Sequence, residues 1–258
     1  MHLIDTHAHL TYEPLASQID QVLSRSRAAG VTGWITVGTS PQENQAALEQ
    51  VGRTDNLWAA VGYHPHNADQ ITEADLGLLE EIAAHPKVAA VGETGLDYHY
   101  LHAGAENQQR IFRAHLDIAA RIQKPVVIHN RQAFEEVMQI LDEYAGQLKG
   151  VVFHCYCGNP EQTRQVLERG YHISFTGIVT FKKADDLRQT ARMAPLDRLM
   201  IETDCPYLSP EPVRRIQPNE PALLIHTAAK LAQIHNLPLD RFAEIVSKTS
   251  CQFFGVDF

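Results

Sequence analysis

The sequence predicts an α/β protein with a (β/α)8 TIM barrel fold, formed as a single domain over residues 1–258. Short runs rich in β-branched residues recur eight times, and longer amphipathic segments lie between them. A strand followed by a helix, repeated in this way, is typical of a parallel sheet covered by helices. The length agrees with this class, because such barrels form one domain of roughly 250 residues.

The predicted strands are short apolar segments, each separated from the next by room for a helix. Parallel strands are expected because every connection is long enough for a crossover helix. In chain order the strands are expected at 2–8, 31–38, 57–63, 87–93, 125–129, 150–155, 171–176 and 198–203.

The intervening segments repeat apolar residues at spacings of three and four, as helices that cover a sheet require. Gly30 and Gly170 stand where helix C-caps are expected. A doubly wound open sheet would need a glycine-rich phosphate turn after its first strand, and the segment DTHAH (5–9) is not one. The clearest helices are 16–29, 105–123, 131–145, 160–169 and two within 219–257, broken near residues 237–239.

The composition is that of a globular protein, with 44% hydrophobic and 21% charged residues. No apolar run is long enough to cross a bilayer and no secretory signal is recognisable, so we expect a cytoplasmic protein without a membrane partner. The formal net charge is −9, whereas proteins that bind long nucleic acid through its phosphates normally have a broad basic face. The charge therefore argues against that class of protein. No obligate protein partner is evident. Reduced thiols are expected at Cys155, Cys157, Cys205 and Cys251.

Two histidines stand one residue apart at the end of the first predicted strand. Because side chains alternate along a strand, His7 and His9 project to the same face, with Asp5 below them. Neutral imidazole is a common protein ligand for zinc-like ions, so the pair can close on one ion. A buried structural pair is the alternative, and these residues alone do not decide between the two.

Ligand-type side chains recur at the ends of other predicted strands. Barrel enzymes place their chemistry at the carboxyl ends of the strands, which meet at one rim. Each residue alone also has a structural interpretation, but six of them at the ends of five strands favour a metal centre. The predicted ligands are His7, His9, Glu93, His129, His154 and Asp204.

The same segments resemble a known family, the TatD-related metal-dependent hydrolases of the amidohydrolase-like barrels. The resemblance implies two divalent ions, one held by His7, His9 and Asp204, the other by His129 and His154, with Glu93 bridging. Imidazole ligands favour Zn²⁺, Mn²⁺ or Fe, whereas the family's DNase members are usually described as Mg²⁺-dependent, so the metal stays open. The resembling segments are DTHAHL (5–10), GYHPH (62–66), GETGLD (92–97), PVVIHNR (125–131), His154, ETDCPYLSP (202–210) and PNEP (218–221).

These residues lead to the hypothesis of phosphodiester hydrolysis, by in-line attack of a hydroxide that bridges two metal ions. Asp204 is the expected general base, and Glu202 is expected to orient a ligand histidine. His64 is expected to donate to a phosphoryl or leaving oxygen. The expected substrates are DNA ends, short oligonucleotides or small phosphate esters, and the resemblance adds 3′-to-5′ deoxyribonuclease activity on single strands.

Further substrate contacts are expected from loops that follow the strands. A guanidinium or ammonium group suits a phosphate, and an aromatic ring suits a nucleobase. The alternative for Arg131 is a residue that simply starts the helix 131–145, and the alternative for Lys182 is a solvated surface charge. Asp5 is expected to be structural. The cationic candidates are Arg131, Lys182, Arg214 and Arg215, and the aromatic ones are Tyr156, Phe181 and Tyr207.

Two other functions stay open. The first is hydrolysis of an amide, lactone or ester by the same ions, including deacylation of aminoacyl-tRNA, because one barrel supports both chemistries. The second is a metal-binding scaffold without catalysis, which the complete ligand set disfavours. Turnover of each substrate class by the metal-loaded protein would discriminate between them.

Overall fold

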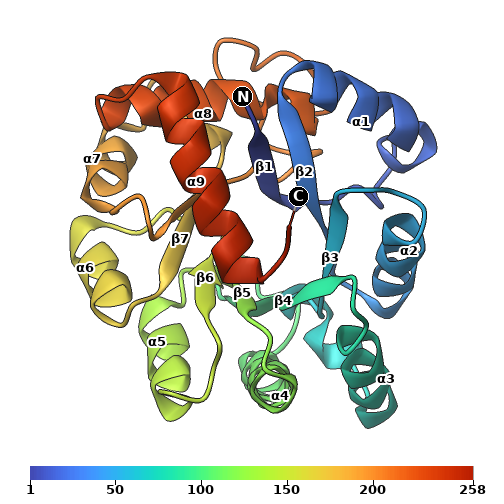
Figure 1. Ribbon diagram of the computed structural model, residues 1–258. Helices are drawn as coiled ribbons and strands as arrows, with labels where there is room; N and C mark the ends of the chain where they lie inside the picture. Colours follow the sequence, from blue (N-terminus) through green and yellow to red (C-terminus); the bar gives the residue numbers. More distant parts are fainter. Residues whose placement is uncertain (258) are drawn as a thin grey trace. The chain divides into compact units, whose positions relative to one another are not determined.

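The computed structural model describes residues 1–257, and the last residue of the predicted 1–258 domain lies outside this range. Eight strands form one sheet in chain order, with parallel pairing of neighbours such as β1 and β2 or β4 and β5. Helices alternate with these strands along the chain (Figure 1). The chain therefore has the (β/α)8 barrel fold that its sequence predicts.

The elements have the following bounds. The strands are β1 (Leu3–Ala8), β2 (Val31–Gly38), β3 (Leu57–Val61), β4 (Val88–Asp97), β5 (Val126–Arg131), β6 (Val151–Phe153), β7 (His172–Phe175) and β8 (Leu199–Ile201). The α-helices are α1 (Ile19–Ala28), α2 (Pro41–Val51), α3 (Glu73–Ala83), α4 (Ala105–Ile122), α5 (Phe134–Glu143), α6 (Pro160–Glu168), α7 (Asp185–Met193), α8 (Leu224–Ile234) and α9 (Leu239–Phe254). Short 3-10 segments are η1 (Ala16–Gln18), η2 (Pro65–Gln70), η3 (Gly177–Thr180) and η4 (Pro221–Leu223).

One strand departs clearly from its predicted bounds. β4 was expected to end at Glu93 but runs on to Asp97, whereas the other strands agree with prediction to within two residues at either end. The predicted helix 16–29 begins as the 3-10 segment η1, and the C-caps of α1 and α6 are Ala29 and Arg169, one residue before the expected glycines. The break between α8 and α9 lies where the sequence predicts it.

The chain forms two compact units. The first unit contains residues 1–36 and 155–257, and the second unit contains residues 37–154. In the first unit the backbone N–H of Asp204 donates to the carbonyl oxygen of His7, and that of His9 to Cys205, both at 2.9 Å, so the carboxyl ends of β1 and β8 lie side by side. Helix α9 packs against both strands (Figure 1). The single-domain organisation stays a prediction.

Side-chain caps fix where several helices begin. Thr72 and Asp75 form a reciprocal capping box at the start of α3, and Asn159 and Gln162 form another at α6. Each box satisfies backbone N–H groups that have no partner inside the helix. The two boxes therefore fix the first residues of α3 and α6.

None of the helices within residues 1–257 has the length and apolar character needed to cross a membrane. All four cysteines are free thiols. The expected cytoplasmic location stays a prediction.

His115 in α4 is a buried histidine with a structural role. Its Nε2 accepts a hydrogen bond from the backbone N–H of Tyr63 at 2.8 Å, and its Nδ1 lies 2.7 Å from the carbonyl oxygen of Ile111. Burial lowers the pKa of His115 to about 4. A histidine in the unfolded chain has a pKa of about 6.5. Between pH 6.5 and 4 this residue is therefore protonated in the unfolded chain and neutral in the folded chain.

The stability that depends on neutral His115 is therefore present above the unfolded pKa and is lost as the pH falls toward 4. We expect the loss to reach at most about 3 kcal/mol, from 1.36 kcal/mol per pKa unit. The variant His115→Gln should flatten this part of the pH dependence in urea unfolding at pH 7, 6 and 5. The exposed His85→Gln is the matched control, and an unchanged slope in His115→Gln would contradict the assignment.

Candidate metal centre

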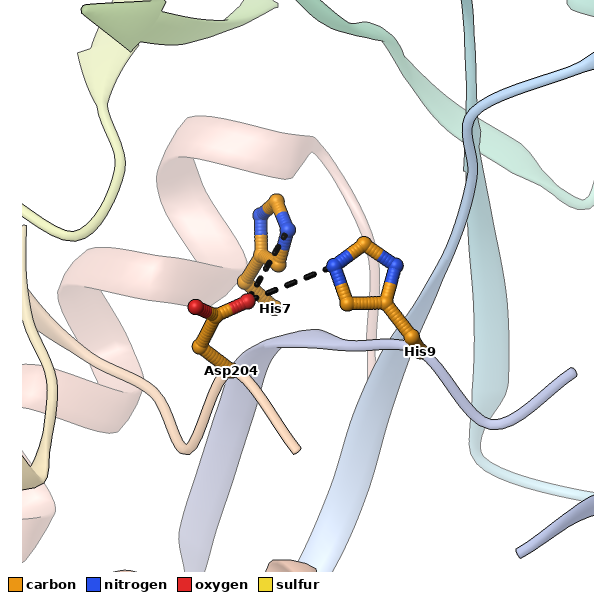
Figure 2. Close-up of side chains that lie close together, drawn as sticks. All are labelled: His7, His9 and Asp204. Atoms are coloured by element: carbon orange, nitrogen blue, oxygen red, sulfur yellow. Dashed lines mark ion pairs between the residues drawn. The ribbon is translucent and has the colours of Figure 1, made fainter. Parts of the chain in front are cut away.

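Three predicted ligands of the first unit lie together. His7 lies in β1, His9 is the first residue after that strand, and Asp204 lies in the segment after β8 (Figure 2). Oδ1 of Asp204 lies 3.3 Å from Nε2 of His9 and 3.8 Å from Nε2 of His7. One ligand atom from each residue lies within 4.8 Å of the other two. These three residues are called the His7 group.

The segment that carries Asp204 is held in a specific backbone conformation. Asp204 has φ 54°, in the left-handed region that few side chains other than Asn and Asp adopt readily. The buried side chain of Asn219 donates to the carbonyl oxygens of Thr203 at 3.0 Å and Tyr207 at 2.5 Å, on either side of Asp204. The PNEP segment therefore positions the carboxylate of the His7 group.

Two neighbouring carboxylates have partners of their own. Asp5 accepts hydrogen bonds from the backbone N–H of Thr203 at 2.9 Å and from its hydroxyl at 2.5 Å, which joins β1 to the segment after β8. Burial raises the pKa of Asp5 to about 7, although the bonds from Thr203 oppose the shift. Glu202 accepts from the backbone N–H of Cys155 at 2.6 Å. Because β8 ends at Ile201, strand alternation does not orient Glu202, and its expected contact with a ligand histidine stays a prediction.

A second set of donors lies in the second unit. Oε1 of Glu93 lies 2.7 Å from Nδ1 of His129, 2.8 Å from Nε2 of His154 and 3.5 Å from Nε2 of His64. Nε2 of His64 also lies 3.3 Å from Nδ1 of His129. Glu93, His64, His129 and His154 are called the Glu93 group. His64 was predicted as a catalytic proton donor and substrate contact, not as a metal ligand, and its Nε2 lies among the predicted ligands Glu93 and His129.

The electrostatics of the Glu93 group favour an ionised carboxylate. Burial alone would raise the pKa of Glu93, but the facing imidazoles of His154 and His64 and the bond to His129 hold it well below its usual range. Burial lowers the pKa of His64 well below its ordinary value, which keeps that imidazole in the neutral form that binds metals. Burial also disfavours the charged form of His129, but bonds to Asp97 and Glu93 outweigh it and raise the pKa. Metal binding requires a neutral imidazole, so a bound ion would displace a proton from His129.

Glycines explain how β4 brings Glu93 to β5. A Cβ atom at Gly95 would lie 2.0 Å from the carbonyl oxygen of His129, and one at Gly92 would lie 2.5 Å from that of Val127. Both glycines also have positive φ, at 138° for Gly92 and 141° for Gly95. The β4–β5 register shifts between Val91 and Thr94, so Glu93 lies at an irregularity of the kind that redirects side chains beside active sites.

Asp97 lies against the Glu93 group and was not predicted as a residue of this site. Its Oδ2 lies 3.1 Å from Nε2 of His129 and 2.9 Å from Nε2 of His66. Its Oδ1 accepts backbone N–H groups of His99 and Tyr100, both at 3.0 Å. Asp97 therefore fixes the ring of His129 from the side opposite Glu93. Its place in the GETGLD motif was the available signal, and a strand predicted to continue past Glu93 would have included it.

Replacing Asp97 by Asn should weaken metal binding while the protein stays folded. Residues that hydrogen-bond a ligand imidazole typically contribute about 10- to 100-fold to metal affinity. We expect a loss of that size for Zn²⁺ or Mn²⁺ in calorimetric titration of Asp97→Asn. Asp117→Asn, an exposed change in α4, is the matched control. An affinity equal to that of the wild type would show that Asp97 does not position His129.

The donors of both groups suit a divalent transition ion. The His7 group offers two imidazoles and a carboxylate, and the Glu93 group offers three imidazoles and a carboxylate. Ligand atoms about 2.1 Å from a shared ion stand roughly 3 to 3.5 Å apart, close to the separations found here. Such nitrogen-rich sets favour Zn²⁺, Mn²⁺ or Fe over Mg²⁺.

The predicted substrate contacts have different surroundings. Arg131 lies with its guanidinium carbon 4.5 Å from the ring centroid of Tyr100. Tyr207 is 53% exposed, and its ring lies edge-on to that of His9. Lys182 is exposed. Tyr156 is only 4% exposed and packs edge-on against Phe175, so its ring has no open face for a nucleobase.

Comparison with known proteins places this chain and its fold in one family. The family model described as TatD related DNase matches residues 4–255. The metal-dependent hydrolase YabD of Bacillus subtilis, named as uncharacterized, is 36% identical over 99% of this chain and 100% of its own length. A protein of Salmonella typhimurium named 3′-5′ ssDNA/RNA exonuclease TatD is 36% identical, over 89% of this chain and 90% of that protein. The crystal structure of YJJV, a TatD homolog from Escherichia coli, superposes with a TM-score of 0.90 at 28% identity, over 99% of this chain and 98% of that one.

The fold and the family place the chain among metal-dependent hydrolases. It belongs to the TatD related DNase family.

Proposed function

We propose that this protein is a 3′-to-5′ exonuclease that hydrolyses the terminal phosphodiester bond of single-stranded DNA, using one divalent ion in the His7 group and one in the Glu93 group. The observation that carries the proposal is the presence of a nitrogen- and carboxylate-rich donor set in each unit, the His7 group in the first and the Glu93 group in the second. Support for the substrate comes from the relatives named as exonucleases. Bridging by Glu93 stays a prediction from the family resemblance.

Each residue has a defined task in this proposal. Bound divalent ions supply a water of lowered pKa and positive charge for the phosphoryl oxygens. The Asp204 side chain is 14% exposed, so its carboxylate can meet a water and accept its proton as the general base. His64 serves as a ligand, because its Nε2 faces Glu93 and His129 and its low pKa disfavours proton donation at neutral pH. Arg131 and Tyr207 are proposed to contact the substrate.

The charge of the chain favours a strand end over long duplex DNA. With a net charge of −9, the protein does not have the general excess of cations that non-specific duplex binding requires. A terminal phosphodiester needs only local positive charge, which metal ions supply.

A time course on DNA with defined ends tests the proposal. The metal-loaded protein should shorten a 5′-labelled linear single strand progressively from its 3′ end and leave the same sequence intact when it is circular. EDTA should stop the reaction, and Mn²⁺ or Zn²⁺ should restore it. Cleavage of the circle would contradict exonuclease action. Turnover of amide, lactone or aminoacyl-ester substrates without cleavage of DNA would favour the alternative hydrolase.

A further inference from the structure

A cavity of about 650 Å³ lies in the first unit, apart from the metal ligands. It is lined by residues of the segments 157–159, 178–187 and 211–214, which follow β6, β7 and β8. Asp204 also follows β8, so the cavity and the His7 group lie on the same carboxyl-end side of the strands. The volume is within the range of roughly 300–1,000 Å³ that is usual for small-molecule sites.

The walls of the cavity are held together by close contacts. The backbone N–H of Glu211 donates to the hydroxyl of Thr180 at 2.8 Å, which ties the segment after β8 to η3. A Cβ atom at Gly177 would lie 2.5 Å from the carbonyl oxygen of Leu208, so the same two segments touch at a second point. The cavity is therefore formed by the fold itself.

One wall carries a stacked aromatic and cationic pair. The guanidinium carbon of Arg214 lies 3.7 Å from the ring centroid of Phe181, and both residues line the cavity. A phenyl ring and a planar guanidinium are the surfaces on which unpaired nucleobases stack.

Positive charge is concentrated beside this pair. Lys182, Lys183 and Arg214 line the cavity and are exposed, and none of them forms an ion pair within residues 1–257. Arg25 and Arg188 of the same unit are, by contrast, paired with Glu220 and Asp185. Two acidic residues, Asp186 and Glu211, also line the cavity, which leaves a local excess of positive charge on a chain of net charge −9. This local charge complements a phosphate.

We propose that the cavity binds one nucleotide of a single strand, with its base stacked on the Phe181–Arg214 pair and its phosphate facing Lys182 and Lys183. The inference rests on the proposed function, because it assigns to the cavity a nucleotide near the bond that is cleaved. Stacking and phosphate contacts recognise no particular sequence.

Binding measurements without metal test this subsite apart from catalysis. Fluorescence anisotropy of a labelled single-stranded oligonucleotide is followed in EDTA at several salt concentrations. Phe181→Leu and Arg214→Lys remove the flat stacking surface and keep the local charge, so each should raise Kd about 10-fold with little change in salt dependence. Lys182→Ala and Lys183→Ala should each lower the slope of log K against log salt by about 0.7. Lys248→Ala, an exposed change in α9, is the control.

Each outcome decides the inference. Wild-type affinity in all four cavity variants, or no binding by the wild-type protein in EDTA, would overturn it. If the oligonucleotide binds, the variants weaken it, and the metal-loaded protein leaves the strand intact, the subsite stands and the proposed exonuclease activity fails.

Discussion

Replacement of Asp204 by Asn should reduce phosphodiester turnover by at least about 10³-fold while the fold is retained. Asn matches the size of Asp and tolerates the left-handed backbone at φ 54°, so the segment after β8 should keep its conformation. The change removes the negative charge that faces Nε2 of His7 and of His9. It also removes the proposed proton acceptor, which is typically worth about 10²- to 10⁴-fold in rate.

The measurement is kcat on a labelled single strand, together with metal content and circular dichroism of the same preparation. Asp197→Asn is the matched control, because the Asp197 side chain is 77% exposed in the same unit. Turnover near the wild-type rate in Asp204→Asn would contradict both proposed roles of Asp204, as a metal ligand and as the general base.

Replacement of Glu93 by Gln should lower phosphodiester turnover by a similar factor, because it weakens metal binding. The carboxylate of Glu93 lies among three imidazoles and is held ionised by them, so Gln removes the only negative charge of the Glu93 group. Three neutral donors bind a divalent ion more weakly than three donors with a carboxylate. We expect the loss of one bound ion per chain and a fall in kcat of about 10³-fold, because a metal-assisted phosphoryl transfer then lacks part of its charge stabilisation.

Metal content and kcat are measured together for Glu93→Gln, and Glu135→Gln on the exposed face of α5 is the control. Retention of both ions with normal turnover would contradict the role of Glu93. Loss of both ions would show that the His7 group depends on Glu93, as bridging predicts.

The strands, the helices and the His7–His9 motif could be predicted because each has a recognisable pattern within a short stretch of sequence. The motif DTHAH predicted that His7 and His9 lie together, as they do although β1 ends at Ala8, and the repeated strand–helix pattern predicted the barrel. The same reasoning ended β4 at Glu93, whereas the strand runs on through Gly95 to Asp97. Only the approach of β5 shows why Gly92 and Gly95 permit a longer strand.

Other parts of the site depend on contacts between distant segments. Asp97 reaches His129 through the pairing of β4 with β5, and His64 joins Glu93 through the loop after β3. The stacking of Arg214 on Phe181 depends on how two loops meet. Tyr156 was predicted to be available to a nucleobase because it stands in a loop, but packing against other segments buries its ring. None of these contacts follows from strand or helix periodicity, although Asp97 stands within the GETGLD motif.

The central claim is that the chain offers two distinct metal-binding groups, and counting bound ions tests it most directly. Equilibrium dialysis followed by elemental analysis should give two ions per chain for the wild-type protein. His9→Gln and His129→Gln should each give one, because each removes a ligand from a different group. Fewer than two ions in the wild-type protein at saturating metal, or two ions in either variant, would contradict the account.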